Sequence, residues 1–164
     1  MQTICDVRID ERLIHGQVAT LWQGIWRCSR IVVVDEVSAT NEMYKSILKI
    51  SCPPGVKLSV LTPEKAALNL SEEKYSNDRI TIVTKVPKNL VEMYHLGWKV
   101  DQVTVGNMSN APFKKIVTST VSVTDEDIKY FKELNELGVS IYSQMVPSAE
   151  RLEFMPLMEK AINK

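Results

Sequence analysis

Segments with strand character and segments with helical periodicity alternate along this chain, and that alternation is its strongest constraint on the fold. Strands are expected at residues 3–10, 31–34, 57–61, 80–84, 102–105 and 139–146, with a further β-branched stretch at 116–123. Helices are expected at residues 16–26, 41–50, from 62 onwards, 87–96, 124–137 and 148–164, the last interrupted or restarted at Pro156. The pattern predicts one three-layer α/β/α domain over residues 1–164 with a mostly parallel central sheet.

Local signals mark where several of these helices begin and end. Thr62-Pro63-Glu64 is a helix start, and residues 124–127 form a capping box with an acidic first turn. Gly97 can take the left-handed conformation that closes a helix. Apolar residues recur at helical spacing in two segments, as Val18, Leu21, Trp22, Ile25 and Trp26, and as Met43, Tyr44, Ile47, Leu48 and Ile50. Trp22 and Trp26 are interpreted as core residues, with contact to a partner as the alternative.

The expected topology also predicts where functional residues lie. Right-handed crossovers bring the loops that follow parallel strands to one edge of the sheet, and ligands of such sheets bind there. These loops come after Ile9, Val34, Leu61, Val83 and Val105.

Composition and missing motifs exclude several classes of function. The chain has 20 Lys and Arg against 20 Asp and Glu, so no global charge attracts nucleic acid. Its six glycines are dispersed, and neither a phosphate-binding glycine loop nor a G-x-S-x-G elbow occurs. The three cysteines form no C-x-x-C pair and are interpreted as reduced, buried thiols. No apolar run reaches membrane-spanning length, so we expect a soluble, unexported protein. The missing glycine motifs and the cysteine spacing lead us to expect neither a cofactor nor a metal ion.

The chain has two histidines, and their surroundings differ. His95 falls late in a predicted helix, where an ordinary structural role is expected. His15 falls between the first strand and the first helix and is followed by Gly16, which allows a tight turn into that helix. We therefore take His15 as the candidate functional histidine.

The residues around His15 have the composition of an anion site. A helix N-terminus offers unpaired N–H groups, and Arg8 and Arg12 add two guanidinium charges able to bind phosphate oxygens. Asp10 lies on the same strand face as Arg8, so it can orient that arginine or hold one ring nitrogen of His15. A surface ion pair with a capping histidine is the structural alternative.

The segment 8–18, Arg-Ile-Asp-Glu-Arg-Leu-Ile-His-Gly-Gln-Val, also resembles a known family. It is similar to the phosphorylation-site segment of enzyme IIB subunits of mannose, fructose and sorbose-type bacterial sugar phosphotransferase systems. Residues 31–36, 53–56, 103–108 and 123–128 resemble further stretches of these subunits, so the similarity extends over essentially the whole chain.

The resemblance implies a phosphoryl carrier, a cytoplasmic transferase at the inner face of the membrane. By this match, Nδ1 of His15 accepts a phosphoryl group from a phosphohistidine of enzyme IIA, giving a pros-phosphohistidine. The group then passes to a sugar that the membrane subunits IIC and IID translocate. The resemblance assigns Arg12 to the phosphoryl oxygens and Arg8, Asp10, Gly16 and Gln17 to binding or supporting roles. It implies no nucleic-acid partner and leaves homodimerisation open.

Two further loops receive weaker assignments. Gly106, Asn107 and Met108 fall where the family often carries a second glycine, and Asn107 replaces that glycine in a turn that is expected to persist. Thr84 and Lys85 lie at the end of the predicted strand 80–84 and could bring a hydroxyl and a cation to the same edge, although a solvated lysine at a strand end is the favoured explanation.

A binding or regulatory module is the rival interpretation from the residues alone. In that case the Arg8, Arg12 and helix N-terminus pocket holds an anionic ligand or a partner carboxylate. His15 then acts as a hydrogen-bond donor and forms no covalent adduct.

Overall fold

A computed structural model describes the backbone of residues 1–164 and the side chains of all residues except Gln17 and Val18. Seven strands form the main sheet: β1 (Thr3–Asp10), β2 (Arg30–Val34), β3 (Lys57–Leu61), β4 (Arg79–Thr84), β5 (Gln102–Asn107), β8 (Ser140–Ser143) and β9 (Leu152–Glu153). Their order is β3-β2-β4-β1-β5-β8-β9, and every neighbouring pair is parallel except β8 with β9. The prediction of a mostly parallel sheet is confirmed.

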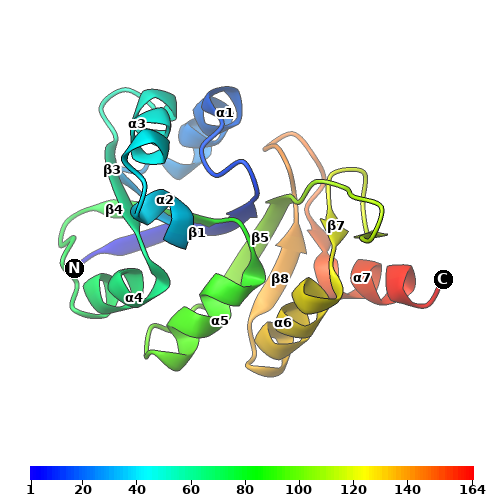
Figure 1. Ribbon diagram of the computed structural model, residues 1–164. Helices are drawn as coiled ribbons and strands as arrows, with labels where there is room; N and C mark the ends of the chain where they lie inside the picture. The colour runs from blue at the N-terminus through cyan, green and yellow to red at the C-terminus, as the bar shows by residue number, and fades with distance from the viewer.

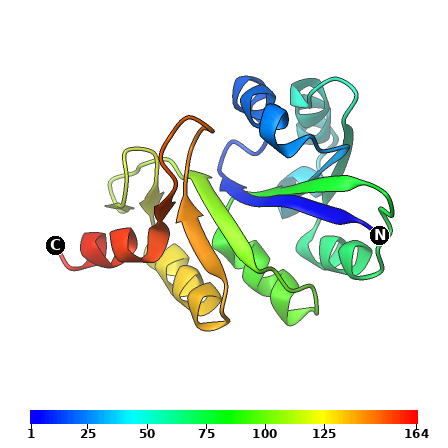
Figure 2. The same cartoon turned by 180° about the vertical axis from the view of Figure 1, so that it is seen from behind.

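Seven helices accompany the sheet: α1 (Gly16–Trp26), α2 (Glu36–Ala39), α3 (Glu42–Ser51), α4 (Pro63–Ser71), α5 (Pro87–His95), α6 (Asp125–Glu136) and α7 (Phe154–Ile162). α1 and α3 lie on one side of the sheet, and α4, α5 and α6 lie on the other (Figures 1 and 2). The buried apolar residues accordingly form two clusters. One includes Trp22, Trp26 and Leu48 from α1 and α3, and the other includes Leu90 and Phe131 from α5 and α6. The three-layer arrangement agrees with the prediction.

The predicted helix starts have the expected hydrogen bonds. The Thr62 hydroxyl accepts from the Lys65 N–H at 3.3 Å ahead of α4, whose first residue is Pro63. The Thr124 hydroxyl accepts from the Asp127 N–H, and the Asp127 carboxylate accepts from the Thr124 N–H, both at 3.0 Å. This capping box satisfies N–H groups that the first turn of α6 leaves without helical partners.

Three expectations about the second half of the chain are wrong in detail. The stretch 116–123 is a small antiparallel pair, β6 (Lys115–Ile116) and β7 (Ser122–Val123), joined by a loop. The late strand is shorter than 139–146. The final helix starts at Phe154 rather than at 148 and places Pro156 in its first turn. Proline is tolerated there because that N–H has no helical acceptor, so α7 continues without a break.

The apolar spacing of α1 and α3 overstates how much of each helix is buried. Trp22 and Trp26 are 5% exposed, but Leu21 and Ile25 on the same helix are 51% and 64% exposed. Leu48 is the only buried residue of α3. Much of the predicted apolar stripe on both helices therefore faces outward.

Candidate phosphoryl-transfer site

The carboxyl end of β1 leads directly into the candidate site. β1 ends at Asp10, and His15 is the N-cap of α1, with φ −105° and ψ 116°. The His15 carbonyl accepts the N–H of Ala19 at 2.8 Å, which starts the helix, while the imidazole makes no capping hydrogen bond to the part of the chain described. The ring is exposed at the positive end of the helix dipole.

Arg12 is fixed by Asp10. The Asp10 carboxylate accepts from the Arg12 backbone N–H at 3.0 Å and from Nε and Nη2 of its guanidinium at 3.1 Å each. The Asp10 side chain is 3% exposed, and that of Arg12 is 31% exposed. Asp10 thus orients Arg12, and neither of the sequence-based alternatives, orientation of Arg8 or of the His15 ring, agrees with these contacts.

The turn between Arg12 and His15 includes one unfavourable backbone conformation. Leu13 has φ 60°, in the left-handed region that side chains other than glycine rarely adopt. Its N–H donates to the Asp10 carbonyl at 2.8 Å, and its side chain is 6% exposed in the cluster under α1. Burial of the leucine offsets the backbone cost and holds the loop in this shape.

Arg8 lies inside the protein, and its guanidinium does not face the site's exposed rim. It is 2% exposed and donates to the carbonyl oxygens of Gln144 at 2.9 Å and Met145 at 2.5 Å. The guanidinium also stacks on Trp22, with its carbon 4.6 Å from the ring centroid. Burial lowers the pKa of Arg8, an effect opposed by the carboxylate of Asp6. Arg8 therefore connects β1 to α1 and to the loop after β8. This geometry does not support the prediction that the Arg8 guanidinium binds an anion at the exposed edge of the sheet.

Gly106 allows Arg8 to lie where it does. A β-carbon at Gly106 would be 2.2 Å from Nη2 of Arg8 and 2.6 Å from its Cζ. Asn107 is the last residue of β5, and its carbonyl accepts the N–H of Glu11 at 2.9 Å, so the expected turn at Asn107 is wrong. Met108 is 3% exposed, and its N–H donates to the Thr120 carbonyl. This backbone N–H is therefore already hydrogen-bonded within the protein.

A contact between Glu11 and Ser109 joins the His15 loop to the segment after β5, and sequence reasoning missed it. The Glu11 carboxylate accepts from the Ser109 N–H at 2.6 Å and from the Ser109 hydroxyl, and the Ser109 carbonyl accepts from Lys114 at 2.8 Å. Burial raises the pKa of Glu11, but the Ser109 bonds and the Lys114 charge outweigh it, so this pKa lies below its ordinary value. The only sequence signal was that both residues follow neighbouring strands.

The remaining predicted site residues differ in their position relative to the sheet edge. Thr84 is fully buried, and its hydroxyl donates to the Val34 carbonyl at 2.8 Å and accepts from Asn89, so it is not presented at the edge. Lys85 lies close enough to lower the pKa of Glu11. Gly16 opens α1, and the side chain of Gln17 lies outside the described residues.

His95 is separate from these residues, as expected. It is the last residue of α5, and its Nε2 lies 2.7 Å from Oε1 of Glu133 on α6, on the other side of the sheet (Figure 1). Among the described residues, no group of three or more His, Cys, Asp and Glu side chains is arranged to hold a metal ion.

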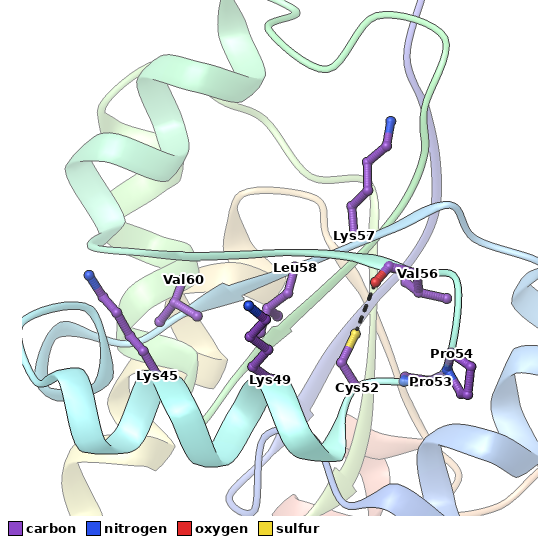
Figure 3. A pocket seen from close by; sticks show the side chains of 9 residues that line it. All are labelled: Lys45, Lys49, Cys52, Pro53, Pro54, Val56, Lys57, Leu58 and Val60. Carbon is purple, nitrogen blue, oxygen red and sulfur yellow. Dashed lines mark hydrogen bonds between the residues drawn. The ribbon is translucent and has the colours of Figure 1, made fainter.

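The site is an open rim. The hollow beneath His15 is about 10 Å³ and is lined by Arg8, Asp10, Leu13 and Ile14 among others. A larger cavity of about 580 Å³ lies between α3 and β3 (Figure 3), and none of the predicted site residues lines it. In the described part of the chain, no helix has the length and apolar character needed to cross a membrane. An exposed imidazole on a rim is accessible to a reactive group carried by another macromolecule.

Comparison with known proteins places this architecture among the IIB components of sugar phosphotransferase systems. Residues 4–164 match the family model described as PTS system sorbose subfamily IIB component. The chain therefore belongs to the sorbose subfamily of IIB components, which are phosphotransferases, and the family suggested by residues 8–18 is confirmed.

Individual relatives agree with that assignment. The chain is 33% identical over 141 residues to a sorbose-specific EIIB component from Klebsiella pneumoniae, covering 86% of each sequence. It is 35% identical over 153 residues to the mannose-specific EIIAB component of Escherichia coli K12, covering 93% of this chain and 47% of that protein. The crystal structure of the IIBSor domain of the Klebsiella pneumoniae sorbose permease superposes with a TM-score of 0.90 at 30% identity, covering 96% of this chain and 97% of that one.

Proposed function

We propose that His15 is the phosphoryl carrier of this IIB component, with residues 1–164 acting as one unit. A IIA-type protein supplies the phosphoryl group, and the sugar handled by the membrane subunits IIC and IID receives it. The mannose-specific relative, whose name joins EIIA and EIIB in one component, supports a IIA-type donor. The observation that carries the proposal is the exposed His15 ring at the N-terminus of α1, one short loop from an Arg12 guanidinium held by Asp10.

Each transfer exchanges one bond to phosphorus for another. In the first, the neutral Nδ1 of His15 attacks the phosphorus, its N–P bond forms, and the N–P bond of the donor histidine breaks. In the second, an oxygen of the sugar attacks, the bond to His15 breaks, and the hydroxyl proton is released. Such transfers depend mainly on positioning and on stabilising the charge of the phosphoryl oxygens.

The residues around His15 supply that stabilisation in this proposal. The Arg12 guanidinium can bind two phosphoryl oxygens at once. Three hydrogen bonds to Asp10 already hold Arg12 in place, so its side chain loses little further freedom when the phosphoryl group binds. The first N–H groups of α1 face the same region, and its first turn has no acidic residue. Arg8 supports the loop from below through its bonds to Gln144 and Met145.

Phosphorylation by a purified donor relay, followed by intact-mass measurement and acid treatment, tests the proposal. We expect the wild-type protein to gain one acid-labile phosphoryl group and His15→Ala to gain none while unfolding at the same urea concentration. His95→Ala is the matched control and should label normally. Arg12→Ala should label more slowly, by at least about tenfold, since charge-stabilising groups contribute at that level or above.

The rival function, non-covalent anion binding, gives a different result in the same experiment. It predicts no mass increase and saturable binding of inorganic phosphate that persists in His15→Gln. Labelling that survives His15→Ala would show that another residue is the carrier.

A further inference from the structure

α3 carries an apolar surface that points away from the core. Met43, Ile47 and Ile50 are 71%, 52% and 85% exposed, and their spacing of four and three residues puts them on one flank of the helix. We call these three residues the α3 stripe. Large apolar side chains gathered on one helix flank mark a contact surface more often than scattered ones do.

The opposite flank of α3 is engaged within the chain. Lys45, Lys49 and Cys52 line the cavity shared with β3, and Figure 3 shows the two lysines rising from α3 toward that strand. The Cys52 thiol donates to the Val56 carbonyl at 3.5 Å. With this flank directed at β3 and Leu48 directed at the core, the α3 stripe is left on the solvent side.

The α3 stripe reaches the His15 region. The carbonyl oxygen of Ser51, the last residue of α3, lies 3.9 Å from the position that a β-carbon of Gly16 would occupy. Ile50, the most exposed member of the stripe, directly precedes Ser51, and Gly16 directly follows His15. A protein that covers the exposed imidazole therefore has the end of the α3 stripe within its footprint.

We propose that the α3 stripe is a docking surface for the IIA-type protein that phosphorylates His15, an inference that rests on the proposed function. The donor is the partner that must bring its own histidine ring to His15, so its folded surface covers the rim. The phosphoryl group itself binds at Arg12, and the α3 stripe supplies the apolar contact area that a specific protein encounter needs.

Phosphorylation kinetics of stripe variants test the proposal. The probe is the phosphorylated IIA protein of the same transport system, varied in concentration against the full chain. For Ile47→Ser/Ile50→Ser we expect the KM for the donor to rise about tenfold or more, with kcat at saturating donor unchanged. Leu68→Ser/Leu96→Ser is the matched control, since these residues are 47% and 55% exposed on the α4 and α5 side of the sheet, and its KM should stay at the wild-type value.

Each alternative outcome has a defined meaning. A wild-type protein that takes no label contradicts the proposed function itself, whereas normal labelling with an unchanged KM in the stripe variant overturns only the docking surface. Normal donor kinetics with slower transfer to sugar in membrane vesicles would assign the stripe to the membrane subunits instead. A wild-type dimer in sedimentation that the substitutions dissociate would assign it to a second copy. Ile50→Ser alone provides the test if the double variant unfolds.

Discussion

The contacts of individual residues around His15 differ from what their types suggest. Two arginines near a histidine look equivalent in the sequence. In the structure, Arg12 lies at the rim in a salt bridge with Asp10, whereas Arg8 is buried against Trp22. The difference follows from strand position. Arg8 lies within β1 under α1, while Arg12 lies in the loop after it.

Gly106→Ala tests the packing of Arg8. The added methyl would overlap a guanidinium whose two terminal nitrogens are bound to carbonyls, so it cannot simply swing away. Overpacking of this kind destabilises by about 1–3 kcal/mol, measured as the free energy of unfolding in urea. Gly24→Ala on α1 is the control, because nothing lies within 4 Å of its added carbon. It should stabilise by about 0.5–1 kcal/mol. Equal effects of the two substitutions would contradict the proposed role of Gly106.

Glu11→Gln tests the bond to Ser109 through its pH dependence. Because the folded pKa of Glu11 is lowered, its carboxylate stabilises the protein fully above the unfolded pKa of about 4.3, and this stability is lost as the pH falls through the lower folded value. The free energies of unfolding of wild type and Glu11→Gln should therefore differ at pH 7 and converge at more acidic pH. A difference independent of pH would show that the charge of Glu11 does not matter.

At the scale of elements, the order and type of the main helices and strands were predictable because local signals agreed with the fold. Thr62-Pro63 and the capping box at Thr124 fix the starts of α4 and α6, and the β-branched run of β2 suits a strand buried on both faces. α2 was missed, since four residues carry too little periodicity to detect.

Exposure was the less predictable property of the same elements. Helical spacing places Ile47 and Leu48 in one broad apolar stripe of α3, but it does not show which part of that stripe the neighbouring elements cover: Leu48 is 5% exposed and Ile47 is 52% exposed. The Glu11–Ser109 bond depends likewise on the meeting of two loops that are 98 positions apart in sequence. Long-range contacts of this kind leave no local pattern.

The position of α1 depends on hydrogen bonds from its two tryptophans. Trp26 Nε1 donates to the Asp6 carboxylate at 3.0 Å, and Trp22 Nε1 donates to the Met145 carbonyl at 2.9 Å. Burial raises the pKa of Asp6, and the bond from Trp26 opposes this rise. Trp26→Phe removes the donor and should cost about 1–3 kcal/mol in the free energy of unfolding. A cost below about 0.5 kcal/mol, within the range of neutral surface changes, would show that packing alone holds the helix.

For the whole molecule, the sheet order explains why the site is where it is. β1 lies between β4 and β5, so the segments after these three strands meet at one edge, bringing Lys85 and Ser109 to the loop that carries His15. Parallel sheets bind ligands at this edge. The meeting of these loops agrees with the topology that the sequence predicts, and the binding role of the edge stays a prediction. The family assignment then adds the class of reaction.

Nitrogen NMR of the two imidazoles is the most direct test of the central claim, because the chain contains only two histidines to distinguish. After incubation with the phosphorylated donor, we predict that the ring of His15 alone changes, with phosphorus bonded to Nδ1, while the signals of His95 stay as before. A phosphoryl group on His95, or unchanged spectra of both rings in the presence of an active donor, would contradict the account.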